Sequence, residues 1–208
     1  MSPRPRKATD DEVFAAAARL MARVGPTQLT LVDIAAEVEL TAGALVQRFG
    51  SKRGLLLAFS ARTAASTGQF FASLRAEHPS PLAALRGYAD CFARMAESPA
   101  AVARNLSYLQ LDLTDAGFRK HVMVQARATR VGLRSLITAA VAAGELLPAA
   151  KPDRLARTVE ALLSGSLMAW AFYRKGSAAR WVRDDLEAIL QPYVPPARQR
   201  RPTRRFNG

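Results

Sequence analysis

Residues 30–52 read TLVDIAAEVELTAGALVQRFGSK, a stretch that predicts two short helices joined by a tight turn, with a third helix starting at its end. Thr30 is a capping residue, and Asp33, three positions later, supplies the acidic partner of a capping box. Thr41 predicts the start of the second helix, and Gly50 can adopt the left-handed conformation that closes it. That order of elements is a helix-turn-helix, so the first hypothesis is DNA binding.

The apolar residues of the two short helices show which faces point inward. Ile34, Ala35 and Val38 recur at helical spacing and give the first helix one buried stripe. Leu45 and Phe49 lie four residues apart in the second helix, so they pack inward together. The first helix therefore supports the motif, and the second turns its remaining side chains towards DNA.

The outward side chains divide into two predicted roles. Contacts to phosphates position the protein, whereas contacts to base edges select the sequence. The predicted phosphate contacts are Thr30, Thr41, Arg48 and Lys52. The side chains predicted to face base edges are Ala42, Ala44, Val46 and Gln47. Gln47 is the best base reader because its amide can pair bidentately with adenine.

Across residues 25–59 the chain resembles the N-terminal domain of TetR-type (TetR/AcrR) transcriptional regulators. The matching residues are Gly25, Thr30, Ile34, Ala35, Gly43, Leu45, Phe49, Ser51, Lys52 and Leu56. Two departures stand out. Glu39 occupies the position of the usual turn glycine, where positive φ costs a non-glycine residue about 1 kcal/mol. Val46 replaces a phosphate-contacting tyrosine, which removes one expected contact and leaves open an apolar contact with a thymine methyl group.

The rest of the chain predicts further helices and no strands. Proline and glycine end the helices, with long ones expected over about 115–143, 152–175 and 177–190. We therefore expect an all-α fold of about nine helices. The predicted parts are a basic arm over 1–8, a helix-turn-helix domain over 9–52, a helical effector-binding and dimerisation domain over 53–191, and a basic tail over 192–208.

The C-terminal half, with AAGELLP followed by DRLARTVEALLSGSLMAW, also resembles TetR-type regulators. The resemblance implies a homodimer on an inverted-repeat operator, and a pocket for an apolar or aromatic effector that releases a repressor. Candidates for the pocket are Phe59, Thr63, Thr67, Phe70, Tyr88, Phe92, Met95, Tyr108, Met123, Arg127, Trp170 and Tyr173. Candidates for the dimer interface are Leu162, Leu163, Ser166, Leu167, Trp181 and Leu186. For both sets, ordinary packing within the chain is the alternative.

Charge favours a polyanionic partner. The chain of 208 residues has a formal net charge of +13, yet residues 1–60 carry eight Lys and Arg against six Asp and Glu. Much of the surplus lies elsewhere, including five arginines between residues 198 and 205. Arg4, Arg6 and Lys7 form the basic arm. A nonspecific nucleic-acid-binding or packaging protein would use the same charge, but it would not need the helical pair of residues 30–52.

Signals for other functions are absent from the sequence. The glycines do not form a nucleotide-binding pattern, and the two histidines, His78 and His121, lie far apart, so we expect neither a cofactor nor a metal site. A small all-α enzyme stays an alternative, because a catalytic triad assembles only in the fold and the sequence does not exclude one. Cys91 is the only cysteine, and we expect it to be a buried thiol. Without a signal peptide or a membrane span, a cytoplasmic protein is expected.

Overall fold

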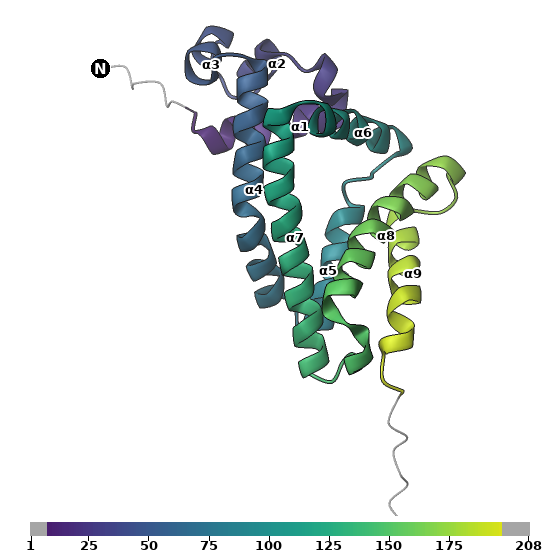
Figure 1. Cartoon of the computed structure of the whole chain (residues 1–208). Coiled ribbons are helices and arrows are strands. Elements are labelled where there is room, and N and C mark those ends of the chain that lie inside the picture. The colour runs from purple at the N-terminus through teal and green to yellow at the C-terminus, as the bar shows by residue number, and fades with distance from the viewer. Residues whose placement is uncertain (1–7, 197–208) are drawn as a thin grey trace, which may run out of the picture.

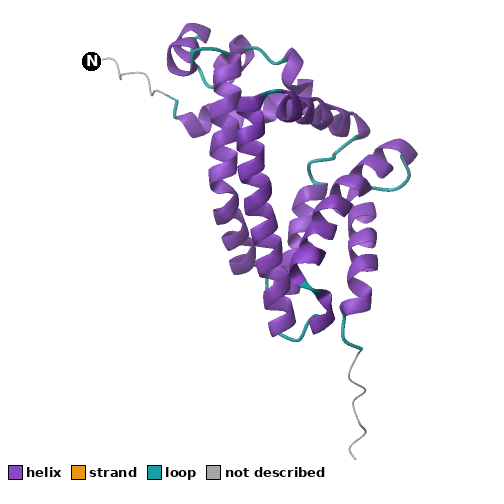
Figure 2. Cartoon of the chain, in the orientation of Figure 1, coloured by secondary structure: helices purple, strands orange, loops and turns teal. Residues whose placement is uncertain are grey.

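The computed structural model of the chain describes residues 8–196; residues 1–7 and 197–208 lie outside the described part. Within that part the secondary structure is helical, without strands, as Figure 2 shows. The elements are α1 (Asp10–Gln28), α2 (Leu31–Glu37), α3 (Ala42–Phe49), α4 (Lys52–Glu77), α5 (Pro81–Ala93), α6 (Pro99–Thr114), α7 (Ala116–Ala142), η1 (Pro148–Ala150), α8 (Pro152–Tyr173), α9 (Ala178–Leu190) and η2 (Gln191–Tyr193). The prediction of an all-α fold with about nine helices is confirmed.

The short helices gather at one end of the molecule. Helices α1, α2 and α3 surround the start of α4, and α6 crosses beside α1 (Figure 1). The long helices α4 and α7 run side by side from that end, while α5, α8 and α9 pack together further away (Figure 1). No helix of residues 8–196 is long and apolar enough to cross a membrane.

Side-chain caps set the starts of the helices around the motif. The Thr30 hydroxyl accepts a hydrogen bond from the Asp33 amide at 3.1 Å, and the Asp33 carboxylate accepts one from the Thr30 amide at 3.2 Å. The Thr41 hydroxyl accepts from the Ala44 amide at 3.1 Å in the same way. Gly50 ends α3 with a φ of 78°. These local features agree with the sequence because each depends on residues within four positions.

Two hydrophobic cores hold the helices together. The larger one joins α5, α7, α8 and α9 with the second half of α4. The smaller one lies under the helix-turn-helix, where α1, α2 and α3 supply most of its side chains. Leu55 and Leu56 of α4 and Phe118 of α7 complete this second core. The core under the helix-turn-helix therefore extends past residue 52 and includes the corner between α6 and α7.

Two predicted basic segments fall on residues without a described structure. The arm with Arg4, Arg6 and Lys7 lies outside the described residues, and so do the five arginines of the tail. The polyanionic partner that their charge favours stays a prediction.

Candidate nucleic-acid interface

Helix α3 presents its outward side at the end of the molecule (Figure 1). Leu45 is fully buried beneath it, whereas Val46 is 47% exposed and Gln47 is also exposed. Ala42 and Ala44 are half-buried. Of the four positions predicted to face base edges, Val46 and Gln47 thus offer the most accessible side chains.

The turn between α2 and α3 accommodates its unusual residue. Glu39 has a φ of 54°, the left-handed conformation for which the family uses glycine. The amide of Leu40, the next residue, donates a hydrogen bond of 2.9 Å to the Ala35 carbonyl and closes the end of α2. The expected strain is therefore present, and it does not prevent the tight turn.

Two of the predicted phosphate contacts are threonines that already cap helices. The Thr30 hydroxyl donates to the Asp33 carboxylate at 2.6 Å while it accepts from the amide of the same residue. The Thr41 hydroxyl is exposed and uses only its acceptor side, towards the Ala44 amide. Thr41 therefore keeps a proton for a phosphate oxygen, whereas Thr30 does not.

Lys52 has a different position from the one that the sequence suggested. Its ammonium group donates to the backbone carbonyls of Pro26, Thr27 and Leu29 at 3.1, 3.2 and 2.9 Å. These bonds use all three protons, so a bond from Lys52 to a phosphate requires the loss of at least one of them, and that contact stays a prediction. The carbonyl oxygens at the end of α1 offset the unfavourable interaction between this cation and the start of α4. The sequence alone does not reveal that these carbonyls lie nearby.

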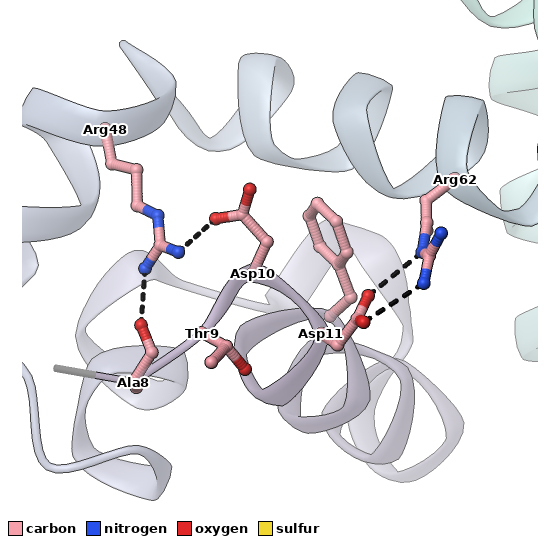
Figure 3. A pocket seen from close by; sticks show the side chains of 7 residues that line it. Ala8, Thr9, Asp10, Asp11, Arg48 and Arg62 are labelled. Carbon is pink, nitrogen blue, oxygen red and sulfur yellow. Dashed lines mark hydrogen bonds and ion pairs between the residues drawn. The ribbon is translucent and has the colours of Figure 1, made fainter. Parts of the chain in front are cut away.

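Arg48 lies at the end of α3 and faces the start of α1. Its Nη1 atom donates to the Ala8 carbonyl at 2.7 Å, and its Nη2 atom pairs with the Asp10 carboxylate (Figure 3). Its guanidinium group also lies 5.5 Å from the centre of the Phe49 ring. Arg48 is accessible, but it is not an unpaired cation in the DNA-free chain.

The corner between α6 and α7 is tied to the start of α4. The Asp115 carboxylate accepts hydrogen bonds from Arg53 at 2.9 and 2.8 Å and from the Gly117 amide at 2.8 Å. The hydrogen bonds from the Arg53 guanidinium, and then those from the backbone amides, lower the pKa of the Asp115 carboxyl. Sequence reasoning missed this pair, since its members lie 62 positions apart.

Part of the predicted effector pocket gathers as an aromatic cluster between α4 and α5. Tyr88 stacks on Phe71 with their ring centres 5.2 Å apart, and its centre lies 6.2 Å from that of Phe70 and 6.4 Å from that of Phe92. Burial, and then the charge of Glu160, raise the pKa of Tyr88 to about 12. The cluster is therefore apolar and neutral.

Other candidates for the pocket lie apart from this cluster. Met95, Met123, Arg127 and Tyr173 are exposed, and Tyr173 stacks on Trp181 with ring centres 5.7 Å apart. Trp170 is a core residue whose indole donates to the Gly176 carbonyl at 3.1 Å. The twelve candidates thus do not form one site. Helical spacing in the sequence did not distinguish core and surface residues from pocket residues.

The other pocket candidates lie along α4 and α6. Phe59 packs against Phe14 of α1, at 6.1 Å between ring centres. Thr63 and Thr67 bond with their hydroxyls to the α4 carbonyls four residues before them. The hydroxyls of Tyr108 and Ser60 share a hydrogen bond of 2.5 Å.

The dimer candidates are mostly interior residues of the chain. Leu163, Leu167 and Leu186 are at most 7% exposed within the larger core. Ser166 is also buried, and it donates to the Asp185 carboxylate at 2.6 Å. These four side chains leave almost no surface for a second copy within the fold of the single chain, and their role in a dimer stays a prediction. Leu162 and Trp181 keep intermediate exposure.

Two hollows of the described surface lie beside α1. One of about 610 Å³ separates the start of α1 from α3 and α4, and contains both the Arg48–Asp10 and the Arg62–Asp11 pairs (Figure 3). Another, of about 330 Å³, lies between α1 and the turn at Glu39. Neither is lined by a residue of the predicted effector pocket. Among residues 8–196 no group of His, Cys, Asp and Glu is arranged to hold a metal ion.

One buried acidic residue was not predicted to have a role. Asp112 of α6 is 7% exposed, and burial raises the pKa of its carboxyl to about 6. Tyr108, one turn earlier, also has its pKa raised by burial. An acidic residue inside a helix otherwise rich in leucine was the available signal.

Comparison with known proteins agrees with this architecture. The family model of bacterial regulatory proteins of the tetR family matches residues 13–59, and that of the tetracyclin repressor-like C-terminal domain matches residues 107–186. No curated protein sequence matches the chain.

Solved structures of TetR-type regulators share the fold. A TetR transcription regulator from Haloarcula marismortui has a TM-score of 0.72 at 16% identity, over 89% of this chain and 98% of that one. Reduced NemR from E. coli has a TM-score of 0.72 at 16% identity, over 91% of this chain and 100% of that one. FadR from Bacillus subtilis in complex with stearoyl-CoA has a TM-score of 0.65 at 15% identity, over 88% of this chain and 98% of that one. With a helix-turn-helix at one end and a matching helical C-terminal part, the chain belongs to the TetR family of bacterial transcriptional regulators.

Proposed function

We propose that the chain is a repressor that binds an inverted-repeat operator as a homodimer and is released by a small molecule. The observation that carries this proposal is the accessible side of α3, where Val46 and Gln47 project beyond a fully buried Leu45. A short helix that is supported from behind and accessible in front fits the major groove. Two such helices read half-sites about one helical turn, roughly 34–36 Å, apart.

Sequence-specific binding is the first test. A duplex selected from a random library is compared with unselected DNA over a series of salt concentrations. A regulator retains an affinity ratio of at least about 10³ between the two duplexes, whereas a packaging protein does not. A ratio near one at all salt concentrations would contradict the proposal and favour the packaging alternative.

Gln47 is the proposed base reader. Gln47→Ala is expected to relax the preference at one position of each half-site by about 1–3 kcal/mol. Thr41→Val is the comparison, because it removes a proposed phosphate contact together with the side-chain cap of α3, and should weaken binding to all sequences alike. A uniform loss of affinity in both variants would remove Gln47 from base readout.

Dimerisation is proposed to use the outward side of α8. Met168 and Phe172 are 40% and 79% exposed there, and Gly165 faces open space in the single chain. Gly165→Arg should therefore leave the fold intact and give a monomer in analytical ultracentrifugation. Gly68 of α4 also faces open space, so Gly68→Arg is the control that should remain dimeric. A wild-type chain that is monomeric at micromolar concentration would contradict the dimer.

The effector is proposed to be apolar or aromatic and to bind near the aromatic cluster of Phe70, Phe71, Tyr88 and Phe92. FadR from Bacillus subtilis, which shares the fold, has a solved structure in complex with stearoyl-CoA, and this supports an apolar ligand. Release requires that the ligand bind two conformations unequally. The Arg53–Asp115 pair supplies a physical link, since it joins the α6–α7 corner to the first turn of α4, directly after α3.

A further inference from the structure

The described part of the DNA-binding end carries no unpaired cation. Residues 8–56 contain five Lys and Arg residues, and all five are bonded within the chain. Four form ion pairs with carboxylates, and one bonds to backbone carbonyls. The pairs are Arg19 and Arg23 with Glu37, Arg48 with Asp10, Arg53 with Asp115, and Lys52 with the carbonyls at the end of α1. A surface proposed to meet DNA is therefore nearly neutral before DNA arrives.

Arg48 is the only one of these five cations that belongs to α3, the proposed recognition helix. Asp10 reaches it from the first turn of α1, 38 positions earlier in the chain, across the mouth of the hollow in Figure 3. Asp11, the next residue, points instead to α4 and binds Arg62 at 2.9 and 3.0 Å (Figure 3). Two adjacent carboxylates thus serve two different helices.

The Arg48–Asp10 pair is accessible enough to exchange partners. The Arg48 side chain is 34% exposed and the Asp10 side chain is 56% exposed. Pairs this exposed are weak because water and salt screen them. A DNA phosphate, which arginine binds in the same forked geometry as a carboxylate, can therefore replace Asp10. When a phosphate replaces Asp10, the Arg48–Asp10 ion pair is lost. This loss of free energy disappears if the Asp10 carboxylate is removed.

We propose that Asp10 competes with DNA phosphate for Arg48 and so lowers the affinity for non-operator DNA. This inference rests on the proposed DNA-binding function. Nonspecific binding depends almost entirely on cations at phosphates, so a neutralised Arg48 weakens it directly. On an operator, base contacts hold α3 in the groove and compensate for the exchange of Asp10 for phosphate.

The test uses a random-sequence DNA duplex about 30 base pairs long, enough for two half-sites one helical turn apart. Asp10→Asn is compared with Asp11→Asn, its matched control. The two substitutions add the same charge, stand in the same turn of α1 and leave the Thr9–Glu12 capping box in place. Affinity is measured by fluorescence anisotropy over a series of salt concentrations.

Asp10→Asn is expected to bind the random duplex about three- to fivefold more tightly than wild type, with a salt slope steeper by about 0.9, one added phosphate contact. Asp11→Asn should show at most a small change that reflects net charge alone. In an Arg48→Ala background, Asp10→Asn should lose its specific effect, because the competing cation is gone.

Equal effects of Asp10→Asn and Asp11→Asn, or an Asp10→Asn effect that persists without Arg48, would overturn the inference. Neither outcome affects the proposed function, provided that wild type binds its selected duplex in preference to random DNA. If wild type shows no such preference, the proposed function itself fails.

Discussion

Lys52 has bonds within the chain that its predicted role at a DNA phosphate does not include. Its ammonium group bonds to three carbonyls at the end of α1, and it is half-buried. Lys52→Met should therefore lower the free energy of unfolding by about 1–3 kcal/mol, since bonds to a charged group are lost and the partly buried carbonyls of Pro26 and Leu29 lose a partner. Chemical denaturation measures this change.

An exposed lysine gives the comparison for Lys52. Lys120 of α7 is exposed, so Lys120→Met removes the same charge and should change stability by less than about 0.5 kcal/mol. If Lys52→Met is as stable as Lys120→Met and only DNA binding is weaker, the result would support the phosphate contact that the sequence predicts for Lys52.

Glu39 carries a local strain that substitution can relieve. Its φ of 54° disfavours a side chain, and glycine has no such penalty. Glu39→Gly should raise the free energy of unfolding by up to about 1 kcal/mol, after the greater freedom of glycine in the unfolded chain is subtracted. Ala36→Gly, inside α2, should instead lower it by about 1 kcal/mol. Destabilisation in both variants would mean that the Glu39 side chain makes a needed contact.

At the scale of elements, Asp115 joins three helices. It ends α6, its carboxylate caps α7, and the same carboxylate binds Arg53 of α4. We expect a graded series in thermal unfolding. Arg53→Ala loses the ion pair and the contact of its guanidinium with the Phe118 ring, whose centre lies 5.9 Å away, and Asp115→Asn keeps a capping side chain, so both should lower Tm slightly. Asp115→Ala loses the cap and the pair together and should have the lowest Tm.

The order of these three variants is the outcome that matters. Circular dichroism at 222 nm, the usual helical signal, follows the unfolding of a chain whose regular secondary structure in residues 8–196 is helical. If Arg53→Ala is as unstable as Asp115→Ala, the ion pair and not the cap would be the main role of Asp115.

The helices were predictable where a few neighbouring residues determine them. Thr30, Thr41 and Gly50 act within one turn of the chain, and the structure has them as the sequence indicates. The partners of Arg48 and Lys52 were not predictable, because they lie 38–40 and 23–26 positions away, respectively. The same holds for Leu163 and Leu186, whose burial depends on how α8 and α9 pack. Periodicity identifies an apolar face, but it does not identify the surface that covers it.

At the scale of the whole molecule, α6 connects the DNA-binding end to the rest of the chain. It packs against α1 on one side and against α7 and α8 on the other. Asp112 is buried on this helix, and its carboxyl has a pKa of about 6 instead of 3.8. In the unfolded chain the group ionises near its ordinary pKa. Between about pH 4 and pH 6 the folded chain therefore holds the extra proton, and Asp112 makes stability fall as the pH rises through that range.

Asp112→Asn removes this pH-dependent cost without a change in side-chain size. At pH 8 the variant should be more stable than wild type by up to about 3 kcal/mol, and below pH 4 the two should be equal, since neither side chain is then charged. Urea denaturation at each pH measures the difference. Asp153→Asn is the control, because the Asp153 side chain is 83% exposed and its substitution should give no such trend. A difference between Asp112→Asn and wild type that does not vary from pH 4 to pH 8 would show that Asp112 is already paired or hydrated in solution. The α6 connection would then carry no buried charge, and its stability would depend on packing alone.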